Sequence, residues 1–147
     1  MTGKYWERFP HGAQAGVRGI GATEEEAFEQ AAHALTSVIT DPVKVQHLEP
    51  VKITCAGATD SDMFAEWVNA LVRRMDERQM LFGHFDVYIC DGRLRATAWG
   101  EELDENRHRP ARRVRGPVDG ALVRQDETGA WLAQCLIGVE AASAANA

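Results

Sequence analysis

The sequence has few cysteines and serines, and it lacks the motifs that accompany nucleophilic catalysis. No two of its three cysteines form a C-x-x-C pair, so neither a zinc knuckle nor a disulfide framework is indicated. Each cysteine lies in an apolar segment, which predicts buried, inert thiols at Cys55, Cys90 and Cys135. No serine has the context of a nucleophile elbow, which speaks against a serine hydrolase.

Signatures of phosphate and zinc binding are missing as well. The stretch GVRGIGATE contains Gly19 and Gly21 but not the third glycine of a dinucleotide-binding fingerprint. Neither G-x-x-x-x-G-K-[ST] nor H-E-x-x-H occurs, so a P-loop nucleotide site and a zinc-protease helix are both excluded.

Long apolar runs and an excess of positive charge are also absent. No run approaches the roughly 18 residues of a membrane span, and the first residues, MTGKYWERFPHG, lack the apolar region of a signal peptide. These features predict a cytoplasmic protein with no membrane partner. A net charge of −6 argues against strong direct nucleic-acid binding, which needs surplus Lys and Arg to displace counterions.

Two segments have the 3.6-residue periodicity of amphipathic helices. The first, TEEEAFEQAAHALTSVIT, begins with Thr23 and Glu26 in the spacing of a capping box. Its apolar positions form one stripe: Phe28, Ala31, Ala32, Leu35, Val38 and Ile39. The second, DSDMFAEWVNALVRRMDERQ, has Asp60 or Ser61 as its expected N-cap. His33 falls off the first stripe and is expected in solvent.

The remaining segments alternate between apolar and polar residues, as strands do. Asp91-Gly92 predicts a tight hairpin turn, a second hairpin is expected to turn through QDETG, and residues 5–20 supply one or two further strands. Because hairpins dominate, the predicted fold class is α+β, with two helices packed on a mainly antiparallel sheet. With 147 residues the chain is expected to form one domain, residues 1–139, followed by a disordered C-terminal tail, residues 140–147.

One short stretch concentrates groups that could carry chemistry. In GRLRATAWGEELDENRHRP, a strand-like half is followed by an acidic and then basic half containing Glu101, Asp104, Arg107 and His108. Carboxylates and an imidazole at this spacing suit a divalent cation, but a charged turn between strands is the commoner explanation of such a pattern.

Two further features of the sequence could take part in binding a ligand. Arg113 and Arg115 flank Val114, so in a strand both project from one face, where their guanidinium groups could grip phosphate or carboxylate. A solvated strand face is the alternative. His11 lies in the glycine-flanked bend FPHGAQAG, where backbone N–H groups could meet a ligand.

Three motifs in the same order resemble the archease family over nearly the whole chain. FPHGAQAGVRGIGATEEEAFEQAAHALTSVITD is similar to the family's "HTADVG" and the helix that follows it, and Trp67, Asn69 and Leu71 match its "W-x-N-x-L" helix. The third motif, "G-R-L-x-A-x-x-x-G-E-x-x-D-x-x-R-H", is matched at Gly92, Arg93, Leu94, Ala96, Gly100, Glu101, Asp104, Arg107 and His108. The resemblance implies an archease-like α+β sandwich built on a strand–helix–strand–strand module.

The resemblance also implies a function and a partner. Archeases are not enzymes; they help a GTP-dependent RNA ligase, which joins ends bearing a 3′-phosphate or 2′,3′-cyclic phosphate, to become guanylylated and to turn over. The family binds a divalent cation through acidic residues, two of which correspond here to Gln14 and Gly138. The family's lysine corresponds to Val114 or Arg115. No cofactor and no metal ligands are therefore predicted for this chain.

Three hypotheses remain. The first is an archease-like accessory protein of an RNA (tRNA) ligase, with a working surface formed by His11, Gln14, Glu101, Asp104, Arg107, His108, Arg113 and Arg115. The second is a metal-free binding module on the same scaffold, for another protein or a small anionic ligand. The third is a metal-dependent hydrolase using Glu101, Asp104 and His108.

Overall fold

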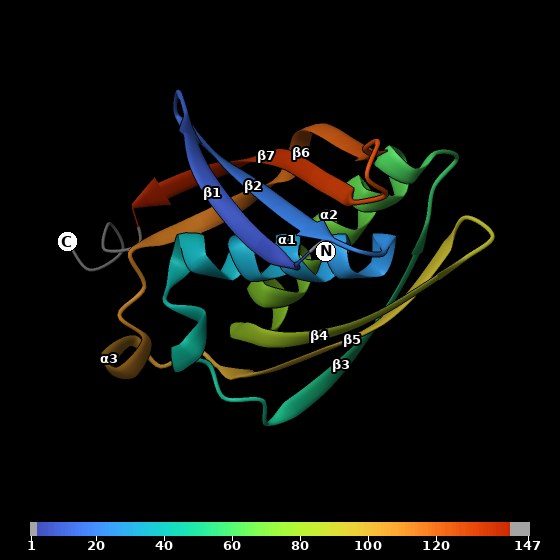
Figure 1. Ribbon diagram of the computed structural model, residues 1–147. Helices are drawn as coiled ribbons and strands as arrows, with labels where there is room; N and C mark the ends of the chain where they lie inside the picture. Colours follow the sequence, from blue (N-terminus) through green and yellow to red (C-terminus); the bar gives the residue numbers. More distant parts are fainter. Residues whose placement is uncertain (1–2, 142–147) are drawn as a thin grey trace.

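The computed structural model describes residues 3–141 and places two helices between two antiparallel sheets (Figure 1). The larger sheet has the strand order β1-β2-β7-β6, with bounds Tyr5–His11, Gln14–Gly21, Trp131–Ala141 and Arg112–Gln125. The smaller sheet has the order β3-β5-β4, with bounds Glu49–Ala56, Arg93–Glu102 and Met80–Cys90. The helices are α1 (Glu24–Ile39), α2 (Asp60–Arg78) and the short α3 (Glu105–His108), and one 3-10 turn, η1, spans Pro42–Lys44.

The predicted α+β class is confirmed, but the single sheet expected from the sequence is in fact two sheets. Helix α1 packs against β2 of the larger sheet and against β4 of the smaller one. It is therefore buried on more than the predicted stripe, and Ala34, Thr36 and Ser37 are also inside. Two sheets form because each has its own apolar face, and a helix that is buried on two sides can cover both.

Local capping explains where the two long helices begin. At α1, Oγ1 of Thr23 accepts a hydrogen bond from the Glu26 amide at 3.1 Å, and Oε1 of Glu26 accepts one from the Ala22 amide at 2.8 Å. At α2 the N-cap is Thr59, whose Oγ1 accepts from the Asp62 amide at 3.0 Å. The expected N-cap of α2, Asp60 or Ser61, was thus one or two residues late.

Helix α2 also covers the outer edge of strand β6. The amide of Val118 donates to Oδ1 of Asn69 at 2.9 Å, and the amide of Val123 donates to Oγ of Ser61 at 3.0 Å. A covered edge cannot pair with another chain there. Asn69 belongs to the motif W-x-N-x-L, in which Trp67 donates from Nε1 to the Phe28 carbonyl at 3.1 Å. In this chain, the motif holds α2 against α1 and β6.

Of three local features predicted from the sequence, the structure confirms one turn and places two side chains, His33 and Cys90, differently. The Asp91-Gly92 turn is confirmed, with φ of 52° and 72°, the left-handed pair of a type I′ turn. His33, expected in solvent, is half-buried against Phe85, and burial, followed by the charges of His84 and His47, lowers its pKa to about 4. Cys90, expected to be buried, is exposed because it ends β4 at the turn.

The C-terminal boundary also differs from the expectation. Glu140 and Ala141, expected in the tail, continue β7 and pair with Arg113 and Arg112 of β6. Residues 142–147, the rest of the predicted tail, lie outside the described residues. Within residues 3–141, no helix combines the length and apolar character needed to cross a bilayer.

Candidate functional site

The structure separates the predicted site residues into two groups. The first group is a row across the end of the larger sheet: His11 pairs with Gln14, Gln14 with Gly138, and Gly138 with Arg115. Directly paired residues of antiparallel strands project from the same face. Residues up to 127 positions apart in sequence, His11 and Gly138, are thereby aligned on the outer face of the sheet. We call these four residues the β1–β6 row.

The basic residues beside this row are paired with acidic ones. Arg115 donates to Oε2 of Glu140 at 3.0 Å, and Nη2 of Arg113 lies 3.7 Å from Oδ1 of Asp76 on α2. Both pairs are largely exposed, so each stabilises the fold only slightly. Arg115 is the residue opposite Gly138, and Val114 is opposite Val139.

The row does not fit the divalent cation that the resemblance implies. The two positions where the family carries aspartates are direct partners, yet one holds the neutral amide of Gln14 and the other has no side chain, Gly138. Hard cations need several charged oxygens, and the carboxylate of Glu140, two residues after Gly138 on β7, is engaged by Arg115. Within residues 3–141 no three His, Cys, Asp or Glu side chains converge in a geometry suited to a metal.

The second group lies where β5 ends and α3 begins. Oδ1 of Asp104 caps α3 by accepting from the amides of Asn106 and Arg107 at 3.0 and 3.1 Å. The ring of His108 accepts at Nδ1 from the Asp104 amide at 2.9 Å, and its Nε2 lies 2.9 Å from Oε2 of Glu101. The imidazole is completely buried. The motif E-x-x-D-x-x-R-H therefore closes on itself through one buried carboxylate.

Glu101 also joins this corner to the segment after η1. Its Oε2 accepts from the Gln46 amide at 2.7 Å, and its Oε1 pairs with the guanidinium of Arg107. Arg107 in turn donates to the Lys44 carbonyl at 2.8 Å. We call Glu101, Asp104, Arg107 and His108, with the backbone of Lys44 and Gln46, the Glu101 network.

The Glu101 network keeps its carboxylate ionised. Burial by itself would raise the pKa of Glu101, but the hydrogen bonds from Arg107, the Gln46 amide and His108 outweigh burial and lower the pKa to about 2. The carboxylate is therefore ionised near neutral pH and carries no proton to donate. Glu101 and His108 bind each other, which leaves the metal-dependent hydrolase of the third hypothesis without two of its ligands.

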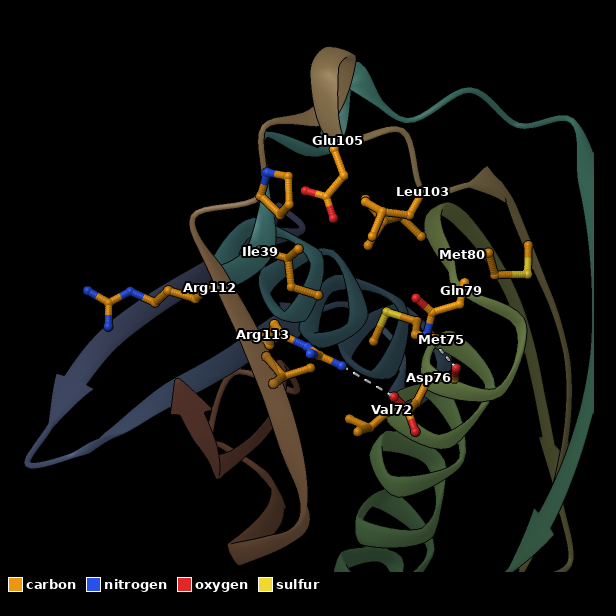
Figure 2. Close-up of a pocket in the computed structure, with 13 residues that line it drawn as sticks. Ile39, Val72, Met75, Asp76, Gln79, Met80, Leu103, Glu105, Arg112 and Arg113 are labelled. Atoms are coloured by element: carbon orange, nitrogen blue, oxygen red, sulfur yellow. Dashed lines mark hydrogen bonds and ion pairs between the residues drawn. The ribbon is translucent and has the colours of Figure 1, made fainter. Parts of the chain in front are cut away.

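A pocket lies beside α3 and the start of β6, and its lining includes no member of the β1–β6 row or of the Glu101 network (Figure 2). It has a volume of about 260 Å³ and lies among the C-terminal ends of α1 and α2, the start of β6, and α3. Its floor is apolar and includes Ile39, Val72, Met75 and Leu103, and Asp76, Glu105, Arg112 and Arg113 stand at its rim. In Figure 2, Arg113 extends toward Asp76, whereas Arg112 points away from the pocket.

A second depression of about 660 Å³ lies beyond Arg113 and reaches Arg115 and Glu140. The two hollows share Arg113 and Asp76, so the side chains of this ion pair stand between them. Arg113 and Arg115 are among the site residues predicted from the sequence, whereas Asp76 and Glu105 are not. Both missed residues are ordinary charged positions in helices, and only the packing of α2 and α3 beside β6 reveals them.

Comparison with known proteins agrees with this geometry. A model of the Archease protein family matches residues 6–139. The chain is 32% identical over 136 residues to protein archease of Pyrococcus furiosus, covering 89% of this chain and 96% of the relative. It is 30% identical over 139 residues to protein archease of Aeropyrum pernix, covering 91% and 96%.

Solved structures share the fold. The solution structure of protein 1598 of Methanobacterium thermoautotrophicum superposes with a TM-score of 0.72 at 29% identity, covering 90% of this chain and 97% of that chain. The crystal structure of an archease and possible chaperone from Thermotoga maritima has a TM-score of 0.54 at 11% identity, which supports the fold alone.

Fold and site together define the class of the protein: an α+β sandwich in which a four-stranded and a three-stranded antiparallel sheet enclose two helices. The chain belongs to the archease family. The resemblance found in the three sequence motifs is confirmed.

Proposed function

We propose that this protein is an accessory protein of a GTP-dependent RNA ligase, whose guanylylation and turnover it promotes without being an enzyme itself. The observation that carries the proposal is the extent of the family match, which runs from residue 6 to residue 139. It spans both the β1–β6 row and the Glu101 network, so neither half of the predicted working surface lies outside the family's region. The proposal places the protein in the cytoplasm together with its ligase.

The two groups of residues have different roles in this proposal. The β1–β6 row and Arg113 are accessible and contact the ligase, with Arg115 presenting its guanidinium at one of the two positions, Val114 or Arg115, that could correspond to the family's lysine. A planar guanidinium can bind phosphate or carboxylate through two hydrogen bonds. The Glu101 network holds α3 in place, which shapes the wall of the pocket at Glu105. Docking, rather than bond-making, is the work of this surface.

Single-turnover guanylylation of the ligase from the same source tests the proposal. We expect the protein to accelerate guanylylation, and we expect Arg115→Glu to remove most of the acceleration because it reverses the charge opposite Gly138. Arg124→Glu is the matched control, since Arg124 is an exposed arginine at the other end of the same strand. Unchanged guanylylation in the presence of the folded wild-type protein would rule the proposal out.

A second candidate function rests on one specific observation. Gln14 and Gly138 are direct cross-strand partners, and neither supplies a carboxylate. A metal-free binding module for another protein or a small anionic ligand needs no cation at this place and agrees with both residues. No acceleration of the ligase, combined with capture of a different partner that Arg115→Glu abolishes, would favour this function.

A further inference from the structure

The smaller sheet exposes a face that the helices do not cover. Helices α1 and α2 pack on its inner face, so the alternate residues of β3, β5 and β4 point outward (Figure 1). The cross-strand rows of the outer face are Thr54–Arg95–Tyr88 and Lys52–Thr97–Asp86. Arg93 precedes these rows on β5 and Trp99 follows them. We call this surface the outer face of the smaller sheet.

Aromatic rings are available on this face. Tyr88 is 69% exposed near the C-terminal end of β4. Trp99 is partly exposed, and its indole Nε1 donates to Oδ2 of Asp86 at 3.3 Å, which fixes the plane of the ring. Tyr88 and Trp99 lie on adjacent strands, two rows apart. An ordered aromatic ring on an open sheet is a surface on which a nucleic-acid base can stack.

The charge of the outer face has the opposite sign to that of the whole chain. The face carries three cations, Lys52, Arg93 and Arg95, against one carboxylate, Asp86, although the net charge of the protein is −6. Asp86 is also held by its neighbours, Trp99 and His84, at 3.3 and 3.2 Å. The negative charge of the chain therefore lies elsewhere, and the outer face is complementary to an anion.

We propose that the outer face of the smaller sheet binds single-stranded RNA, with bases stacked on Tyr88 and Trp99 and phosphates bound by Arg95, Arg93 and Lys52. An exposed sheet that combines aromatic rings with basic side chains is a common way to bind unpaired RNA. An acidic protein would be attracted by the cations but would leave the rings without a planar partner. The face points away from the larger sheet, so this binding does not depend on the proposed function.

Fluorescence anisotropy with a labelled ten-residue oligouridine tests this inference on the full chain. We expect saturable binding at low salt, with a slope of log K against log salt of about −2 for three phosphate contacts. Tyr88→Ala should weaken binding about tenfold through the lost stacking. Tyr5→Ala is the matched control, because Tyr5 is 52% exposed but lies on the other sheet. It should bind as wild type does.

The cations provide a second readout. Arg95→Ala should reduce the magnitude of the salt slope by about 0.7, the value of one phosphate contact. Arg109→Ala changes an exposed arginine outside the smaller sheet and should leave the slope unchanged. The proposal is overturned if Tyr88→Ala and the wild type bind the oligouridine with equal affinity. It is also overturned if inorganic polyphosphate at equal charge competes fully with the oligouridine, or if oligothymidine binds more tightly than oligouridine. An acidic protein that binds this face while the RNA does not would overturn it as well.

Discussion

His108 and Glu101 are joined by a hydrogen bond whose direction the neighbouring backbone determines. Nδ1 of His108 accepts from the Asp104 amide at 2.9 Å, so in the neutral ring the proton is on Nε2, which donates to Oε2 of Glu101, also at 2.9 Å. The tautomer follows because an amide cannot act as an acceptor. This bond connects the end of β5 to the last residue of α3.

Removing the Glu101 carboxylate should destabilise the protein. Glu101→Ala leaves the Gln46 amide and Nε2 of His108 without their acceptor in a buried place, and we expect a loss of about 3 kcal/mol in the free energy of unfolding. Urea denaturation measures it. Glu102→Ala is the control, since Glu102 is the exposed neighbour on the same strand. An equal loss in both variants would contradict the role given to the network.

The same carboxylate predicts a loss of stability in acid. The pKa of Glu101 is lowered from 4.5 to about 2 in the folded protein, so its contribution is fully present above pH 4.5. It is lost as the pH falls from 4.5 toward 2, because the unfolded chain takes up the proton first. The difference in unfolding free energy between wild type and Glu101→Gln should shrink over this range. A difference that stays constant with pH would contradict the prediction.

Glu24 should have the opposite effect. Its Oε2 is buried and has no hydrogen-bond partner among the described residues, and burial, followed by the charge of Asp60, raises its pKa to about 7. The folded state then binds a proton more tightly than the unfolded state, so stability decreases as the pH rises from 4.5 to 7. Glu24→Gln should stabilise the protein at pH 8 by about 1–2 kcal/mol.

Denaturation at two pH values checks the Glu24 prediction. The gain should disappear near pH 4, where both wild type and variant are neutral at position 24. A gain of the same size at both pH values would contradict the prediction, because it would not depend on the protonation of Glu24.

Restoring the two carboxylates of the β1–β6 row should create a cation site. Gln14 and Gly138 are opposite each other, so the double change Gln14→Asp with Gly138→Asp places two carboxylates on one face of the sheet. A Cβ at position 138 would lie 3.2 Å from the Arg115 carbonyl oxygen, which requires a small shift of β6. Titration calorimetry with Ca²⁺ should detect binding that EDTA reverses.

The wild-type protein and Gln14→Asp alone are the controls for this gain. We expect neither to match the double variant, because one added carboxylate supplies too little of the charge that a hard cation needs. Equal Ca²⁺ binding by the wild type would mean that the cation is held elsewhere in the chain.

The local chemistry of the chain was readable from the sequence. Thr23 and Glu26 mark the start of α1, Asp91-Gly92 marks the hairpin, and the three motifs identify the family, because caps, turns and motifs depend on residues near one another in sequence. The α+β class followed from the dominance of hairpins. These features need no knowledge of which strand pairs with which.

The tertiary structure decided what the candidate residues do. Only the pairing of the four strands of the larger sheet aligns the members of the β1–β6 row. Likewise, only the path of the chain after η1 brings the Gln46 amide to the Glu101 carboxylate. The sequence predicted one surface from these residues, whereas the fold divides them into an accessible row and a network centred on the buried Glu101 and His108. Burial and long-range pairing depend on the closure of the two sheets around α1 and α2, which no local pattern encodes.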